Sequence, residues 1–182
     1  MNENGAIICA SLYEMQNIKM SYFNRIERLL VQNAITGCTM MINRALANML
    51  SSIPDDAIMH DWWIALYAMT FGKIVYLKDS QILYRQHNFN LVGAKNTRSI
   101  AYITRQLRNI KGMKDNINQT YLQARALYEC LVTTEINPAL LNVIGRYAKL
   151  SNKNKIMKIL TIVRYGYLKN SFIRRLGQLI LC

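Results

Sequence analysis

The sequence predicts an α/β domain that is followed by a basic helical region. Up to about residue 95, short apolar runs typical of strands alternate with helical patterns. After residue 95 the strand signals fade, and long helical patterns follow one another. The charge changes at the same place: residues 1–95 hold 8 Lys and Arg against 7 Asp and Glu, whereas residues 96–182 hold 15 against 3. We therefore expect one domain in residues 1–95 and a separate helical region in residues 96–182.

The elements expected in the first region follow from apolar spacing and from chain-breaking residues. Apolar runs predict strands at residues 6–10, 38–42, 73–77 and 81–86. Helical spacing predicts helices at residues 22–32, 44–50 and 61–71, and Gly72 ends the last of these.

The second region is expected to consist of helices. Their predicted ranges are residues 98–113, 118–134, 138–150, 155–168 and 171–181. Pro138 suits the first turn of its helix, and Asn137 suits the cap in front of it.

The end of the chain is strongly basic. Residues 139–182 hold nine basic residues and no acidic one, mixed with Leu, Ile, Val, Phe and Tyr. This composition is typical of helices that lie on an anionic bilayer, and we expect Tyr165, Tyr167 and Phe172 at the level of the headgroups. An ordinary basic helical subdomain with a solvated face is the alternative. Nucleic acid is not an expected partner, because the sequence has neither a glycine-rich RNA motif nor a clear recognition helix.

The sequence also bears on location. Residues 1–5 are polar, unlike a signal peptide, and no apolar run reaches the ~18–20 residues that a membrane-spanning helix needs. Cys9, Cys38, Cys130 and Cys182 are widely spaced, so we expect them to be small core residues in a reducing compartment. We therefore expect a cytoplasmic protein that is soluble or peripheral on a membrane.

The first candidate for chemistry is Asp61, which lies between His60 and the pair Trp62–Trp63 at a predicted helix start. The free N–H groups and the dipole of a helix start stabilise a carboxylate, and a carboxylate beside apolar rings suits a general base. A helix-capping aspartate without chemistry is the alternative. Adjacent tryptophans on a helix cannot both face one core, so we expect one to pack inward and the other to face a cleft.

Four further residues are candidates by position. His87 follows a strand-like run, where an imidazole suits a metal or a phosphate-bearing ligand, although hydrogen-bonded structural histidines are more common. Arg85 could bind a phosphate group, although an arginine exposed to solvent is the more common case. Asn90 is a residue type that favours turns. Gly37 lies ahead of a strand-like run and permits a close approach of the backbone to a ligand.

In this order the motifs resemble the C-terminal part of glycosyltransferase family 2, in particular its bacterial rhamnosyltransferase-like members. The resemblance is carried by residues 36–43 (TGCTMMIN), 60–63 (HDWW) and 84–93 (YRQHNFNLVG). It covers residues 1–95 well and the basic tail more loosely. It implies the C-terminal half of a glycosyltransferase A domain, a Rossmann-like α/β fold, with an incomplete sheet.

The resemblance also implies an activity. Such enzymes transfer a sugar, here with rhamnose as a candidate, from a nucleotide-sugar donor to a saccharide or lipid-linked saccharide acceptor, usually with inversion. The setting would be bacterial surface polysaccharide synthesis at the inner face of the cell membrane. Asp61 would be the catalytic base that takes the proton of the acceptor hydroxyl in a single displacement.

Other roles follow from the same resemblance. Gly37 would lie beside the sugar, and Trp62 and Trp63 would line the acceptor side. His87 would help to hold a divalent metal, Mg or Mn, on the donor diphosphate. Arg85 is a further candidate for substrate binding, as is its neighbour in the motif, Asn90.

The chain departs from the family in one large respect. Members carry a nucleotide-binding half and an Asp-x-Asp motif before the matching region, whereas the only aspartate pair here is Asp55–Asp56. His60 stands where many members have Glu. We therefore expect the chain to be inactive or weakly active alone. A truncated reading frame, one piece of a split gene and a fragment are the alternatives, and a split gene would have a separate chain that supplies the N-terminal half. The alternative is a non-catalytic membrane-surface or interaction module that uses the basic helical tail.

Overall fold

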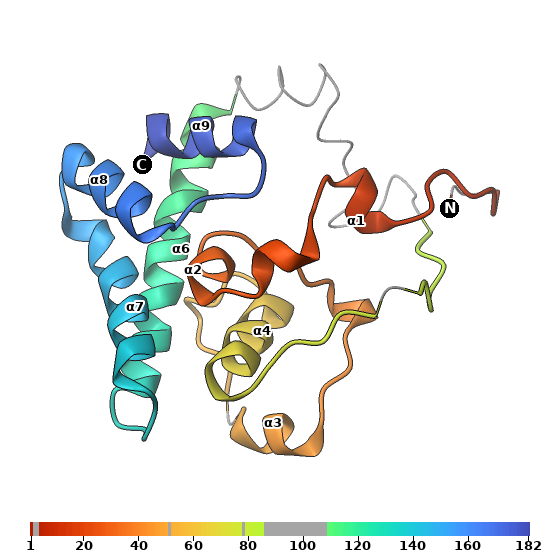
Figure 1. The fold of residues 1–182 in the computed structure, drawn as a ribbon, viewed down its shortest axis with the longest axis horizontal. Coiled ribbons are helices and arrows are strands. Elements are labelled where there is room, and N and C mark those ends of the chain that lie inside the picture. Colours follow the sequence, from red (N-terminus) through yellow and green to blue (C-terminus); the bar gives the residue numbers. More distant parts are fainter. Residues whose placement is uncertain (2–3, 51, 78, 86–108) are drawn as a thin grey trace.

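The protein is built from helices that are joined by turns and extended segments (Figure 1). The computed structural model describes all residues of the chain except 2–3, 51, 78 and 86–108. The longer helices are α4 (His60–Phe71), α6 (Ile110–Leu131), α7 (Pro138–Ala148), α8 (Lys155–Tyr165) and α9 (Phe172–Leu181). The shorter elements are α1 (Leu12–Met15), η1 (Met20–Phe23), α2 (Ile26–Leu29), η2 (Gly37–Thr39), α3 (Arg44–Met49) and η3 (Lys149–Asn152).

The expected α/β class, with the half-sheet of a Rossmann-like domain, is wrong. The described residues contain no strand. The runs at 6–10, 73–77 and 81–85 are irregular, and the predicted strand at 38–42 begins inside η2 instead. An alternating apolar pattern favours an extended backbone, but a stable sheet also needs several strands that pair. Without such partners, apolar side chains such as Ile7, Val75 and Leu83 stay exposed.

These extended segments lie close to one another near the N-terminus. The terminal ammonium of Met1 donates to the carbonyl oxygen of Tyr84 at 2.9 Å. The rings of Tyr13 and Tyr76 meet edge to face, with 5.4 Å between their centroids. The segments are therefore neighbours in space, although they do not form a ladder.

The long helix α6 is the main support of the C-terminal part. Its buried residues include Ile117, Thr120, Ala124 and Leu127, which recur at helical spacing and face the core. The predicted break near residues 114–117 is wrong, because the polar residues there lie on the exposed face of one continuous helix. The start of the helix predicted at 98–113 lies mostly outside the described residues.

Helix α7 runs back along α6 in the opposite direction (Figure 1). The prediction for its start is confirmed: the Asn137 side chain accepts the N–H of Ala139 at 2.9 Å, and Pro138 occupies the first turn. The two helices approach closely where Gly145 faces Tyr128. A Cβ added to Gly145 would lie 2.7 Å from Cε2 of that ring.

Asparagine and glycine delimit α8. The Asn154 side chain accepts the N–H of Met157 at 2.9 Å. Gly166 follows the helix with φ 75°, a left-handed conformation that glycine adopts without strain. The chain then turns through Tyr167 toward α9.

One continuous core joins the N-terminal and C-terminal helices. Helix α2 contacts both α4 and α7. Its Leu29 is fully buried, as are Trp63 of α4 and Tyr147 of α7. The predicted domain boundary near residue 95 lies outside the described residues. The predicted helix at 22–32 is replaced by η1 and α2, because the backbone of Arg25 between them is extended.

Candidate functional site

The strongest candidate site is centred on Asp61 in the first turn of α4. Its carboxylate accepts the backbone N–H of Gly37 at 2.9 Å through Oδ2 and the side-chain amide of Asn33 at 3.0 Å through Oδ1. The residue is only 3% exposed. Hydrogen bonds to a charged acceptor are stronger than neutral ones, so this network fixes the orientation of the carboxylate.

The loop in front of η2 is shaped to reach this carboxylate. The side chain of Asn33 also accepts the backbone N–H of Ile35 at 2.8 Å, which folds residues 33–37 over the start of α4. A Cβ on Gly37 would lie 2.8 Å from Nε2 of His60. The absence of a side chain at Gly37 therefore permits the close approach of backbone to helix.

The two tryptophans do not face a cleft. Trp62 is 6% exposed and Trp63 is 0% exposed. The indole N–H of Trp62 donates to the carbonyl oxygen of Leu29 at 2.6 Å, and Trp63 packs against Tyr67. The expectation that one tryptophan would be open to a ligand is therefore wrong. Both rings are buried, although they lie on different sides of α4, because α4 is covered by α2 and by other parts of the core.

The site brings together some of the residues that the sequence suggested. Gly37 and Asp61 are joined by a direct hydrogen bond, and His60 lies beside them. Arg85 is exposed at the end of an extended segment. His87 and Asn90 lie outside the described residues.

A divalent metal has no cluster of ligands in the described part of the chain. No group of three or more His, Cys, Asp or Glu side chains gathers there. The expectation that the cysteines are core residues is wrong for the exposed Cys38 and Cys130 and the half-buried Cys9, whereas the half-buried Cys182 packs against the core.

The site supports one kind of chemistry in particular. Each carboxylate oxygen of Asp61 accepts one hydrogen bond in the structure and has a second lone pair. The helix start and the two N–H donors stabilise the charged form of the carboxylate, which is the form that can accept a proton from a hydroxyl group. The same network also has a structural effect, because it ties the loop at residues 33–37 to α4.

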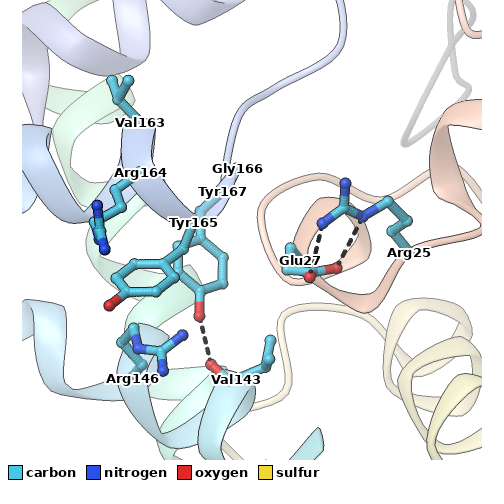
Figure 2. A pocket seen from close by; sticks show the side chains of 9 residues that line it. All are labelled: Arg25, Glu27, Val143, Arg146, Val163, Arg164, Tyr165, Gly166 and Tyr167. Atoms are coloured by element: carbon cyan, nitrogen blue, oxygen red, sulfur yellow. Dashed lines mark hydrogen bonds and ion pairs between the residues drawn. The ribbon is translucent and has the colours of Figure 1, made fainter. Parts of the chain in front are cut away.

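A second feature, not expected from the sequence, is a hollow between α2, α7 and α8. Its volume is about 320 Å³ (Figure 2). We call it the arginine hollow; its lining includes Arg25, Arg146, Arg164, Val163 and Tyr165. The guanidinium of Arg146 lies 3.7 Å from the ring centroid of Tyr165, while Arg25 is paired with Glu27 at 3.0 Å.

The charge in the hollow acts on its tyrosine. A hydrogen bond with Arg164 and the positive charge of Arg146 lower the pKa of Tyr165. Tyr165 and Phe172 are exposed, whereas Tyr167 is fully buried, so the expected position of Tyr167 at headgroup level is wrong. The hydroxyl of Tyr167 instead donates to the carbonyl oxygen of Val143 at 2.7 Å. The hollow escapes sequence analysis because it depends on how three separate helices pack.

No helix in the described residues combines the length and the apolar content that crossing a bilayer requires. We compared the chain with family models, with curated proteins and with solved structures, and none of them matches it.

Proposed function

We propose that this chain supplies the catalytic base of an inverting glycosyltransferase that acts in bacterial surface polysaccharide synthesis. The observation that supports this proposal is the buried, doubly hydrogen-bonded carboxylate of Asp61, which links two of the three motifs that resemble family 2. The donor would be a nucleotide-sugar, with dTDP-rhamnose as a candidate. The acceptor would be a saccharide or a lipid-linked saccharide.

In this proposal Asp61 acts on the acceptor hydroxyl. The carboxylate takes the hydroxyl proton while the oxygen attacks the anomeric carbon, and the bond from that carbon to the nucleotide diphosphate breaks. The configuration is inverted because a single displacement occurs. Gly37 and Asn33 hold the carboxylate in place for this step. A divalent metal, Mg or Mn, would neutralise the leaving diphosphate, but no part of this step depends on a metal site in the described residues.

The nucleotide-binding part is assigned to a separate chain. The exposed apolar side chains on the extended segments support this assignment, among them Ile7, Val75, Leu77 and Leu83. Exposed apolar side chains of this kind are suited to a contact with another polypeptide. Such a contact would bury side chains that are now in contact with water.

The proposed location is the inner face of the bacterial cell membrane, where lipid-linked acceptors are found. The basic and apolar composition of residues 139–182 supports it.

The proposal is tested by transfer of labelled sugar from dTDP-rhamnose to the lipid fraction of bacterial membranes. The chain is assayed together with the polypeptide encoded directly upstream of it. We expect Asp61→Asn to lower the rate by about 10²–10⁴-fold, because the proton acceptor is lost. Asp55→Asn, which changes an exposed aspartate nearby, serves as the control and should leave the rate unchanged.

A purely structural role of Asp61 would give a different pattern. Asn33→Ala removes a partner of the carboxylate but keeps the carboxylate itself. If Asp61 is the base, Asn33→Ala retains much of the rate at a temperature where both variants are folded. Equal losses in the two variants, or a normal rate in Asp61→Asn, would remove Asp61 as the base.

A further inference from the structure

Helix α9 presents its apolar side to solvent. Phe172, Leu176 and Ile180 are 77%, 50% and 55% exposed and follow one another at intervals of four residues, with Ile173 beside them. We call these four residues the α9 stripe. The opposite face carries Gln178, which is 2% exposed and donates to the carbonyl oxygen of Tyr167. Leu179 and Leu181 also pack against the core, so α9 carries apolar residues on two sides and leaves one apolar side in solvent.

Helix α8 also exposes an apolar stripe, although Ile162 on its other side is fully buried. Ile156, Leu160 and Val163 are 71%, 58% and 54% exposed and are spaced at four and three residues, so they form one stripe along the helix. We call them the α8 stripe. The buried residues of this helix are Thr161 and Ile162. Two successive helices thus expose apolar stripes, which marks an interaction surface rather than scattered exposed residues.

The positive charge near the two stripes indicates which kind of partner would bind them. Between residues 139 and 182 all charged side chains are basic. Lys155 and Arg164 are exposed on α8, and Arg175 lies on α9. A second copy of the chain would bring two positive surfaces together, whereas an anionic bilayer offers both an apolar interior and negative headgroups.

The arginine hollow adjoins the α8 stripe, since Val163 belongs to both. Neither Arg146 nor Arg164 has an ion pair with a carboxylate among the described residues. Their guanidinium groups lie on either side of Tyr165, at 3.7 and 5.8 Å from its ring centroid (Figure 2). Arginine binds phosphate oxygens with two parallel hydrogen bonds, so this hollow is suited to a phosphate group.

We infer that α8 and α9 dock on an anionic bilayer, with their apolar stripes in the acyl boundary and a lipid phosphate bound by Arg146 and Arg164. This inference rests on the membrane location proposed above and is independent of the role of Asp61. It specifies which surface of the chain meets the lipid and which two residues bind a headgroup.

Co-sedimentation of the full chain with vesicles tests the apolar stripes. One set of vesicles contains phosphatidylglycerol and phosphatidylcholine, and the other contains phosphatidylcholine alone. We expect strong binding only to the first set, and at least a tenfold weaker binding for Leu160→Asn/Leu176→Asn. The matched control is Leu77→Asn/Leu83→Asn, which changes two leucines on the extended segments that are each 66% exposed and should bind like the wild type.

A second pair of variants tests the phosphate site. Arg146→Gln/Arg164→Gln should weaken binding to the anionic vesicles about tenfold or more, and Lys111→Gln/Lys114→Gln, with two exposed lysines of α6, should weaken it much less. If both double variants lost vesicle binding equally, the arginines would contribute only general positive charge, and the headgroup site would be overturned. Binding of inorganic phosphate to the free chain that Arg146→Gln/Arg164→Gln abolishes, while the same variant binds anionic vesicles like the wild type, would assign the hollow to free phosphate and overturn it as well.

Two outcomes would overturn the docking surface itself. One is equal binding of the wild type to both kinds of vesicle, or none to either. The other is a dimer in sedimentation equilibrium that Leu160→Asn/Leu176→Asn converts to a monomer, because the stripes would then pair two copies. Asp61→Asn should bind vesicles normally, so a failure here is distinguishable from a failure of the sugar-transfer proposal.

Discussion

The carboxylate of Asp61 accepts the backbone N–H of Gly37, which lies 24 residues earlier in the chain. This bond joins the first turn of α4 to the loop that leads into η2. Asn33 completes the connection from the other side of the same carboxylate. Because the group is almost fully buried, each of its partners contributes to stability as well as to the proposed site.

Removal of the Asn33 side chain should therefore destabilise the protein. Asn33→Ala deletes the bond to Asp61 and the bond to the N–H of Ile35, so we expect the free energy of unfolding to fall by about 1–3 kcal/mol. Urea unfolding monitored by circular dichroism measures this change. Asn118→Ala, at an exposed position of α6, is the control and should not lower stability. An equal loss in both variants would contradict a specific role of Asn33.

Because α6 and α7 are in close contact at Gly145, adding a single methyl group there should lower the free energy of unfolding. Gly145→Ala would place a Cβ 2.7 Å from the Tyr128 ring, so we expect a loss of about 1–3 kcal/mol in the free energy of unfolding. Gly177→Ala is the matched control. Its Cβ would lie 3.4 Å from the flexible end of Met113, and alanine favours the helix, so it should be neutral or stabilising. Thermal unfolding of both variants checks the difference in sign.

The left-handed backbone at Gly166 predicts which substitutions there cost more stability than others. Gly166→Ala should cost about 1–2 kcal/mol, because a Cβ is disfavoured at φ 75°. Gly166→Asn should cost less, because asparagine tolerates this conformation. Urea midpoints of the two variants test the order. An alanine variant as stable as the wild type would show that the turn after α8 can adopt another conformation.

Lys169 predicts how stability depends on pH. Burial, and then the charge of Arg174, lower its pKa to about 8. The unfolded chain keeps this proton up to the ordinary lysine pKa of about 10.4. Between these values the unfolded state binds more protons, so the free energy of unfolding should rise with pH, by about 1–2 kcal/mol from pH 8 to 10. Above this range buried tyrosines with raised pKa values, such as Tyr147, oppose the rise.

Urea unfolding at a series of pH values measures this effect. Lys169→Met should be more stable than the wild type near neutral pH and should lose the rise between pH 8 and 10. Lys149→Met, at an exposed lysine, should keep the rise. A flat wild-type profile would contradict the lowered pKa.

Local signals in the sequence predict several helices correctly. The Asn137–Pro138 pair fixes the start of α7 because a cap and a first-turn proline act within a few residues. The helix from residue 61 to Phe71 matches α4 within one residue. Such elements need only their own residues, so they are readable from the sequence.

Features that depend on distant parts of the chain are predicted less well. The strand pattern around Val75 is consistent with an extended backbone, but the pattern does not supply a strand that pairs with it, so no sheet forms in the described residues. Gly37 and Asp61 could be assigned to one site only through the resemblance to a family. Asn33 was missed because an asparagine between a helix and a loop has no distinctive spacing. Both tryptophans were expected to differ in exposure, but α4 has neighbours on more than one side.

The aromatic residues of the core form two groups that can be followed separately by optical methods. Trp62 and Trp63 form the first group, and both are buried. These are the only tryptophans of the chain, and both report on the surroundings of α4, Trp62 through its bond to Leu29 of α2 and Trp63 through its contact with Tyr67. The rings of Tyr121, Tyr147 and Tyr167, which meet edge to face and at a tilt, lie instead in the C-terminal part of the core. Tryptophan emission and tyrosine near-ultraviolet circular dichroism therefore follow the two ends of the core independently. Coincident unfolding curves would mean that the core melts as one cooperative unit, and separated curves would mean that its two ends melt in sequence.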